Sequence, residues 1–208
     1  MSGVAIVDER FCFPDETNLT VRKTSVFFPG DGFIVYDPNG EIILRFDSYG
    51  PDSEPKHELI LMDASGKCLL TLLRKTPSLH QRWEGFFGER LEGQHPIFSV
   101  YKSSIIGQSN LMVEVHGDPS EEYQVKGSFS RRCCKIYNTS LGAPSDDHVA
   151  EIKRKVDPST NVMLGKDVFW LCVKPGFDGA FGMGLVLILD QVYGDDTYDD
   201  EQQIDATL

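Results

Sequence analysis

The 208-residue chain lacks any apolar run of the roughly 20 residues that a membrane-spanning helix needs. It also lacks the pattern of a secretory signal peptide, because Asp8, Glu9 and Arg10 stand where the apolar core of such a peptide would continue. We therefore expect no transmembrane segment and a cytoplasmic protein, with the nucleus and the periphery of a membrane as alternative locations.

Cysteine and histidine pairs with the spacing of a zinc site are also missing. The five cysteines are an odd number with no C-x-x-C motif, and the five histidines are scattered along the chain. We expect reduced cysteines that pack as small hydrophobic side chains, and no metal or other cofactor.

Basic residues are fewer than acidic residues. The chain has 20 basic and 32 acidic residues, a net charge of −12, which argues against a general nucleic-acid binder. Six of the acids follow Gly194 with no base among them: Asp195, Asp196, Asp199, Asp200, Glu201 and Asp205. We expect residues 194–208 to form an acidic disordered tail. The alternatives are an acidic contact for a partner and a cover over a basic groove on the same domain.

Motifs of enzyme chemistry are absent as well. No serine or cysteine lies in a recognisable nucleophile motif, and Gly30-Asp31-Gly32 lacks the strand, glycine loop and helix of a phosphate-binding site. Asp146, Asp147 and His148 are more typical of a solvated turn than of a calcium site. We expect a protein without enzymatic activity.

The chain does contain a long succession of short β-prone runs. After a flexible leader at residues 1–18, the runs lie at 19–28, 33–37, 41–49, 58–63, 68–75, 82–89, 97–103, 111–116, 123–130, 133–138, 148–156 and 167–175. Pro29–Gly32, Asp37–Gly40 and Asp63–Gly66 are typical hairpin turns between them. Strands joined so tightly run antiparallel, so the sequence predicts a meander. The longer connections, where function could lie, are 50–57, 104–110, 139–147 and 157–166.

The segment Asp178–Val192 differs because it is apolar on every side. As a helix of 15 residues with Asp178 as its N-cap, it must be enclosed by protein, since it is too short to span lipid comfortably. Its expected core residues are Phe181, Met183, Leu185, Val186, Leu187, Ile188 and Leu189. Twelve strands enclose more space than their own side chains fill. The sequence therefore predicts a closed antiparallel β-barrel around this C-terminal helix.

Several motifs resemble the LURP-one-related family of plants. They are Glu58–Lys67, Leu69–Lys75, Arg82–Glu84, Gly127–Phe129, Cys134–Tyr137, Val149–Lys155, Leu164–Phe169 and Val173–Gly176. The resemblance covers residues 19–193, which we take as the domain. It implies a mainly β, Tubby-like barrel of about twelve strands around a hydrophobic helix, the fold of Tubby and of phospholipid scramblases. It also implies a link to plant defence signalling, without a defined biochemical activity.

Basic residues occur in short groups: Arg22-Lys23, Arg74-Lys75, Arg131-Arg132 with Lys135, and Lys153-Arg154-Lys155. A phosphoinositide headgroup needs two or three Lys or Arg side chains that converge on one place. Lys153, Lys155, Arg131, Arg132 and Lys135 are our candidates for such an anion or lipid headgroup site. Strand alternation points Lys153 and Lys155 to solvent and Arg154 inward, where it needs a partner. The alternative is a paired structural arginine and lysines that serve solubility.

Aromatic residues lie beside some of these bases. Trp83, Phe86 and Phe87 could insert at a membrane interface or receive a peptide. We expect them instead in a core strand against the central helix, and we place Trp170 in the core as well.

The sequence thus predicts a monomeric, single-domain binding or signalling module. Our first hypothesis for its partner is a phosphoinositide headgroup at the basic groups. The second is a protein partner, with the chain acting as a protein-interaction or transcription-regulatory scaffold through its loops or its acidic tail.

Overall fold

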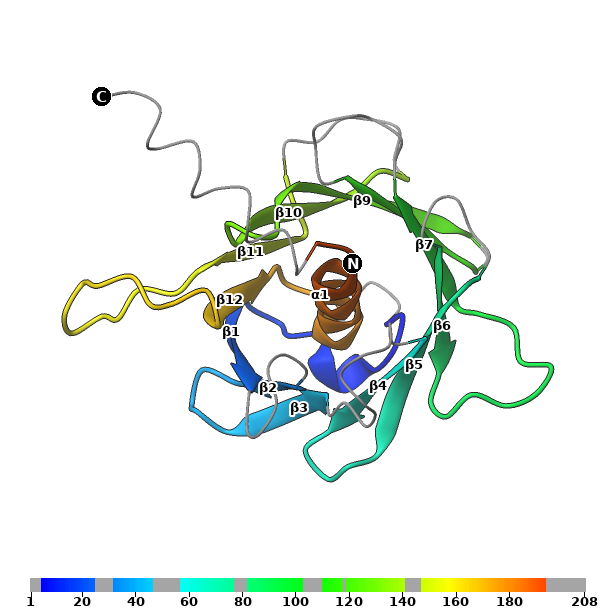
Figure 1. Cartoon of the computed structure of the whole chain (residues 1–208), viewed down its shortest axis with the longest axis horizontal. Helices are drawn as coiled ribbons and strands as arrows, with labels where there is room; N and C mark the ends of the chain where they lie inside the picture. The colour runs from blue at the N-terminus through cyan, green and yellow to red at the C-terminus, as the bar shows by residue number, and fades with distance from the viewer. Residues whose placement is uncertain are drawn as a thin grey trace.

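Twelve β-strands form one closed antiparallel barrel around a single α-helix in the computed structural model (Figure 1). The structure describes residues 5–24, 32–46, 57–76, 82–102, 110–117, 119–140 and 147–193. Of the predicted features, the acidic tail, most of the turn Pro29–Gly32 and most of the connections 50–57, 104–110 and 139–147 lie outside these ranges. The predicted mainly β barrel with a C-terminal helix inside it is confirmed.

Each of the twelve predicted runs overlaps one strand. The strands are β1 (Thr17–Thr24), β2 (Gly32–Tyr36), β3 (Ile42–Phe46), β4 (Glu58–Asp63), β5 (Cys68–Arg74), β6 (Trp83–Phe87), β7 (Phe98–Lys102), β8 (Leu111–Val115), β9 (Glu121–Ser128), β10 (Cys133–Asn138), β11 (Ala150–Arg154) and β12 (Val168–Val173). Of these, β1, β2 and β9 begin one or two residues before their predicted runs. Strands that follow one another in sequence pair with each other, and β1 pairs with β12 to close the barrel. Closure therefore gives a partner to both ends of the meander.

Turn chemistry places the hairpins where the sequence predicts them. In the turns Asp37–Gly40 and Asp63–Gly66, each glycine N–H donates to the carbonyl oxygen of the aspartate three residues earlier. Gly40 and Gly66 have φ of 86° and 87°, in the left-handed region that favours glycine. These glycines thus set the direction in which β3 and β5 return.

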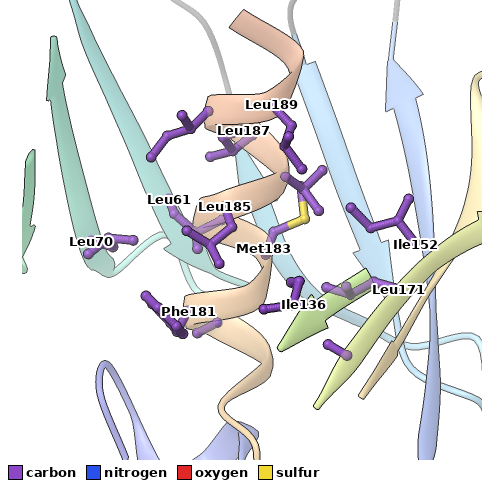
Figure 2. Close-up of a cluster of buried hydrophobic side chains, with 14 of the residues drawn as sticks. Leu61, Leu70, Ile136, Ile152, Leu171, Phe181, Met183, Leu185, Leu187 and Leu189 are labelled. Carbon is purple, nitrogen blue, oxygen red and sulfur yellow. The ribbon is translucent and has the colours of Figure 1, made fainter. Parts of the chain in front are cut away.

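The helix α1 (Gly179–Tyr193) fills the barrel. All seven side chains expected in its core, Phe181, Met183, Leu185, Val186, Leu187, Ile188 and Leu189, are at most 1% exposed. Figure 2 shows several of them among Leu61, Leu70, Ile136, Ile152 and Leu171 of the barrel wall. Burial of one such side chain stabilises the fold by about 1.5–3 kcal/mol, so the helix and the barrel stabilise each other.

Residues 5–16, expected as part of a flexible leader, instead pack across the end of the barrel where α1 begins. Val7 and Phe11 are buried in the same hydrophobic core as the helix, and Glu9–Phe11 form a short 3₁₀-helix. The apolar residues of this segment are too few to form a core alone, but they cover apolar surface that the barrel end would otherwise expose.

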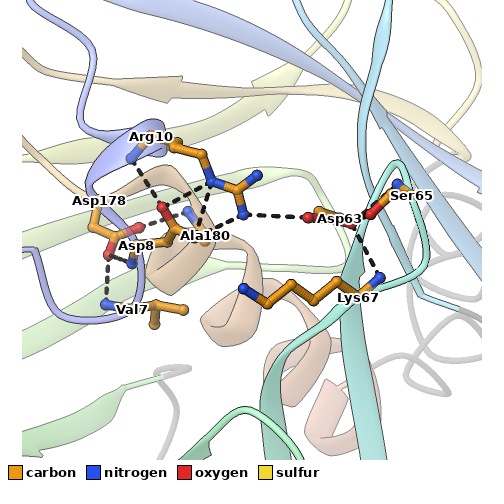
Figure 3. Close-up of polar contacts among 8 residues, drawn as sticks. All are labelled: Val7, Asp8, Arg10, Asp63, Ser65, Lys67, Asp178 and Ala180. Atoms are coloured by element: carbon orange, nitrogen blue, oxygen red, sulfur yellow. Dashed lines mark hydrogen bonds and ion pairs between the residues drawn. The ribbon is translucent and has the colours of Figure 1, made fainter.

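Asp178 fastens this segment to the helix. One carboxylate oxygen accepts hydrogen bonds from the N–H groups of Ala180 and Phe181, as an N-cap does, at 2.9 and 3.1 Å. The other oxygen accepts from the N–H groups of Val7 and Asp8 at 2.6 and 3.0 Å (Figure 3). The predicted N-cap is confirmed, and its second role depends on residues 170 positions away in the chain.

Arg10 links the same segment to the barrel wall. Its guanidinium lies 2.8 Å from the Asp8 carboxylate and 3.2 Å from that of Asp63 on β4 (Figure 3). Hydrogen bonds from the Ser65 hydroxyl, the Lys67 N–H and Arg10 lower the pKa of Asp63 to about 2. Asp63 thus stays ionised between the β4–β5 turn and the N-terminal segment.

Candidate functional site

In the part of the chain that the structure describes, no three His, Cys, Asp or Glu side chains lie close enough together to bind a metal ion. The five cysteines are free thiols. Burial raises the pKa of Cys134 to about 12, which makes this thiol a poor nucleophile. Over the described residues, no helix is long and apolar enough to cross a membrane.

Lys153 and Lys155 both lie close to one indole ring on the outside of the barrel. Their ammonium nitrogens are 5.7 and 5.9 Å from the ring of Trp170. Lys153 is the cross-strand partner of Trp170, and Trp170 lies opposite Thr20 of β1. The Lys155 ammonium also donates a hydrogen bond to the Thr20 hydroxyl at 2.8 Å. Two cations from β11 and the residue just after it therefore meet the aromatic ring of Trp170 on β12, beside Thr20 of β1.

The prediction of Trp170 in the core is wrong. Its neighbours Phe169 and Leu171 are buried, and the side chains of a strand alternate between its two faces. Trp170 therefore faces outward and is half-buried under the lysines. The apolar character of the run around Trp170 concealed this alternation.

The same outer surface continues over two more strands. Lys135 of β10 lies between its cross-strand partners Lys126 and Glu151, and the Lys126 ammonium is 5.4 Å from the ring of Tyr137. Glu151 is 4.0 Å from Lys153. An ion pair this exposed contributes at most about 1 kcal/mol. We call this surface the basic face; its members are Lys126, Lys135, Tyr137, Lys153, Lys155 and Trp170.

The two arginines of the β9–β10 turn, Arg131 and Arg132, lie in different environments. Arg131 is exposed, whereas Arg132 is buried with a φ of 51°. The Arg132 guanidinium lies 4.1 and 4.5 Å from the rings of Phe129 and Phe169, and it donates to the carbonyl oxygens of Lys166 and Phe129. Burial lowers its pKa. Arg132 is therefore a packing residue, and the prediction that it belongs to a headgroup site is wrong.

Arg154 points away from Lys153 and Lys155, as strand alternation predicts. Its guanidinium donates to the carbonyl oxygen of Leu164 at 2.9 Å, across the β11–β12 hairpin. This favours the alternative of a paired structural arginine at that position. In the group Arg22-Lys23, Arg22 is exposed, while the Lys23 ammonium lies 3.2 Å from the buried carboxylate of Asp190 on α1.

The aromatic residues of β6 also differ in their exposure to solvent. Trp83 is buried in the same core as the helix, as expected. Phe86 is buried too, but it points to the other face of β6 beside its cross-strand partner Thr71, with the Arg90 guanidinium 5.3 Å from its ring, so its placement against the central helix is wrong. Phe87 is 57% exposed, so its placement in the core is wrong. It is the last residue of β6 and is followed by the turn at Gly88, where the barrel wall ends.

A pocket of about 210 Å³ lies at the end of the barrel that carries the N-terminal segment. Its polar groups are largely engaged with protein. The Tyr123 hydroxyl donates to Glu121, burial raises the pKa of Tyr123, and the Lys174 ammonium lies 2.6 Å from Glu16. The lysines of the basic face, which have weaker contacts, are better placed to receive an anion.

A closed antiparallel barrel of twelve strands around one apolar helix defines the class of this domain, a helix-filled β-barrel. The model of a family described as LURP-one-related matches residues 17–190, and the chain belongs to that family. Protein LURP-one-related 12 of Arabidopsis thaliana is 59% identical over 199 residues, which are 95% of this chain and 88% of that protein. Protein LURP-one-related 5 of the same plant is 59% identical over 198 residues, 94% of this chain and 92% of that one.

A solved structure has the same fold. The X-ray structure of another Arabidopsis thaliana protein matches with a TM-score of 0.64 at 25% identity. The match covers 91% of this chain and 99% of that one. It therefore extends over nearly the whole barrel and helix.

Proposed function

We propose that this protein is a non-enzymatic module that binds phosphorylated headgroups of inositol lipids at the basic face. The proposal is carried by one observation, the two ammonium groups of Lys153 and Lys155 beside the outward-facing ring of Trp170. Lysine donates charge-assisted hydrogen bonds to phosphate oxygens, and tryptophan is suited to the boundary between water and lipid. As the family resemblance implies, the binding step would serve plant defence signalling.

The net charge of −12 opposes this function at long range but does not decide it. At physiological ionic strength, charges further apart than about 8 Å are largely screened. The acid nearest to the two lysines in the register is Glu151, which lies towards the end of the barrel with the N-terminal segment. An anion next to Lys155 is therefore closer to the two lysine ammonium groups than to the Glu151 carboxylate. The resemblance to Tubby concerns the fold and does not support the proposed site, because function depends on the residues of the site.

The test replaces both lysines by acids. Lys153→Glu/Lys155→Glu should weaken sedimentation with vesicles of phosphatidylcholine and a phosphorylated phosphatidylinositol by about 30-fold or more, because each base near such a surface contributes about 1 kcal/mol. Binding of the unaltered protein should also weaken from low to physiological salt.

The matched control is Lys67→Glu/Lys102→Glu, which changes the net charge equally with two exposed lysines outside the basic face. It should keep most of the binding. Equal losses in both double variants would show that only overall charge matters and would contradict a site at the basic face.

We propose a protein-interaction scaffold as the second candidate function, because Phe87 and Leu91 expose apolar surface in and after β6. They are 57% and 69% exposed, more than is usual for side chains of their size. Phe87→Ser/Leu91→Ser should then abolish binding to an identified, purified partner protein and leave the vesicle binding described above unchanged. The opposite result in both assays would exclude this surface.

A further inference from the structure

The connection between β11 and β12 is one of the four in which the sequence predicts function, and the structure describes all of it. Residues 155–167, which we call the arm, project from the barrel wall (yellow in Figure 1). The arm continues the hairpin: the N–H of Leu164 donates to the carbonyl of Lys155, and that of Asp157 to the carbonyl of Val162. It is therefore a two-stranded extension with its turn far from the helix.

The turn of the arm is held by one side chain. The Asp157 carboxylate accepts hydrogen bonds from the hydroxyl and the N–H of Ser159 at 2.6 and 2.7 Å, which lower the pKa of Asp157. The N–H of Asn161 donates to the Asp157 carbonyl, and Asn161 adopts a φ of 54°. These bonds fix the direction of the two residues that follow.

Those two residues are apolar and face water. Val162 is 58% exposed and Met163 52% exposed. Exposed apolar side chains that occur singly need no explanation, but here two adjacent ones stand at the end of an ordered extension. Lys153 lies on β11 below the arm, Lys155 is the first residue of the arm, and Lys166 is exposed on the returning side. The acids of this region are Asp157, engaged in the turn, and Asp167 at the base.

We propose that the arm inserts Val162 and Met163 into the acyl boundary of an anionic bilayer while the basic face holds the headgroups. This inference rests on the proposed function and specifies its ligand as a lipid in a membrane instead of a free inositol phosphate. Attachment at a membrane interface strengthens with the apolar area that is buried and with attraction to anionic lipids, and an apolar insertion beside a basic patch supplies both.

Charge decides between a bilayer and a second copy of the chain as the occupant. A two-fold contact between two arms would bring Lys155 and Lys166 of both copies into one interface, and this accumulation of like charge is unfavourable. A membrane surface presents phosphates to the same lysines. The arm therefore fits a lipid surface better than it fits itself.

The experiment compares two ligands with one variant. Val162→Ser/Met163→Ser should lower binding to vesicles that contain a phosphorylated phosphatidylinositol by about tenfold or more. Its affinity for soluble inositol trisphosphate, measured by calorimetry, should equal that of the unaltered protein. The matched control, Ile42→Ser/Leu91→Ser, removes two exposed apolar side chains from elsewhere in the barrel and should bind vesicles normally.

The outcomes separate the two proposals. If the unaltered protein binds neither vesicles nor inositol trisphosphate, the proposed function itself fails. If it binds both and Val162→Ser/Met163→Ser binds vesicles equally well, only the insertion is wrong. A dimer in gel filtration that this variant alone abolishes would identify a second copy as the occupant and overturn the inference.

Tryptophan fluorescence gives an independent readout of depth. Trp83 is 1% exposed inside the barrel, so brominated lipids can reach only the ring of Trp170. Vesicles with brominated acyl chains should quench the fluorescence of the unaltered protein. They should quench that of Trp170→Phe and of Val162→Ser/Met163→Ser much less. Equal quenching in the insertion variant would again contradict the inference.

Discussion

At the scale of single residues, the side chain of Asp178 joins two segments of the chain. One buried carboxylate accepts four backbone hydrogen bonds, two from the first turn of α1 and two from the N-terminal segment. A helix cap is predictable from sequence, because its partners lie two or three residues away. The bonds to Val7 and Asp8 are not predictable in this way, because they require the chain ends to meet.

Asp178→Ala should lower the free energy of unfolding by about 3 kcal/mol or more. Loss of an N-cap costs about 1 kcal/mol, and each buried N–H left without an acceptor costs about 1–3 kcal/mol. Urea denaturation measures the change. The control Asp157→Ala removes a turn carboxylate that lies outside the core and should cost about 1 kcal/mol or less. Similar losses in both variants would contradict the double role of Asp178.

At the scale of elements, Gly127 shows why β9 and β10 can approach each other. Its φ is 123°, and a Cβ atom at this position would lie 2.1 Å from the carbonyl oxygen of Cys133. That oxygen belongs to the backbone of β10, so it cannot move away without breaking the strand pair. Gly127 is one of the residues in the LURP-one-related motifs of the sequence.

Gly127→Ala should therefore destabilise the barrel by about 2 kcal/mol or more, since strain in this region of φ costs about 1–3 kcal/mol before the clash is counted. Thermal unfolding followed by circular dichroism would detect a clear drop in Tm. Gly165→Ala is the control, because a Cβ atom there meets nothing within 4 Å. A Tm of Gly127→Ala equal to that of the control would show that the two strands adjust freely.

At the scale of the whole molecule, charge is distributed unevenly. The chain carries −12, six of these charges lie after Gly194, and a basic face lies on the barrel. Removal of residues 194–208 halves the net charge and leaves the described core intact. The tail is therefore a source of negative charge that acts against any anionic ligand.

Deletion of residues 194–208 should strengthen binding to vesicles with a phosphorylated phosphatidylinositol several-fold at low salt, and less at physiological salt, because repulsion at a distance is screened. Sedimentation measures the binding, and the Tm should stay nearly unchanged. The matched control keeps the length and replaces the six acids by serine and asparagine. Weaker binding after deletion would indicate that the tail itself contributes to attachment.

Much of the architecture was decided by the sequence alone. Strands and turns are encoded locally, by β-prone runs and by residues such as Gly40 and Gly66 between them. A helix that is apolar all round must be enclosed, so Asp178–Val192 together with twelve strands leaves a closed barrel as the economical solution.

Only the tertiary structure decided how the functional groups meet. It placed Trp170 on the outside beside Lys153 and Lys155, buried Arg132 against two aromatic rings, and folded the leader over the barrel end. Each of these contacts joins segments that are distant in the chain or depends on which face of a strand is covered. The pairing register and the closure of the barrel determine which segments meet and which strand face is covered. Register and closure are not properties of a local stretch of sequence.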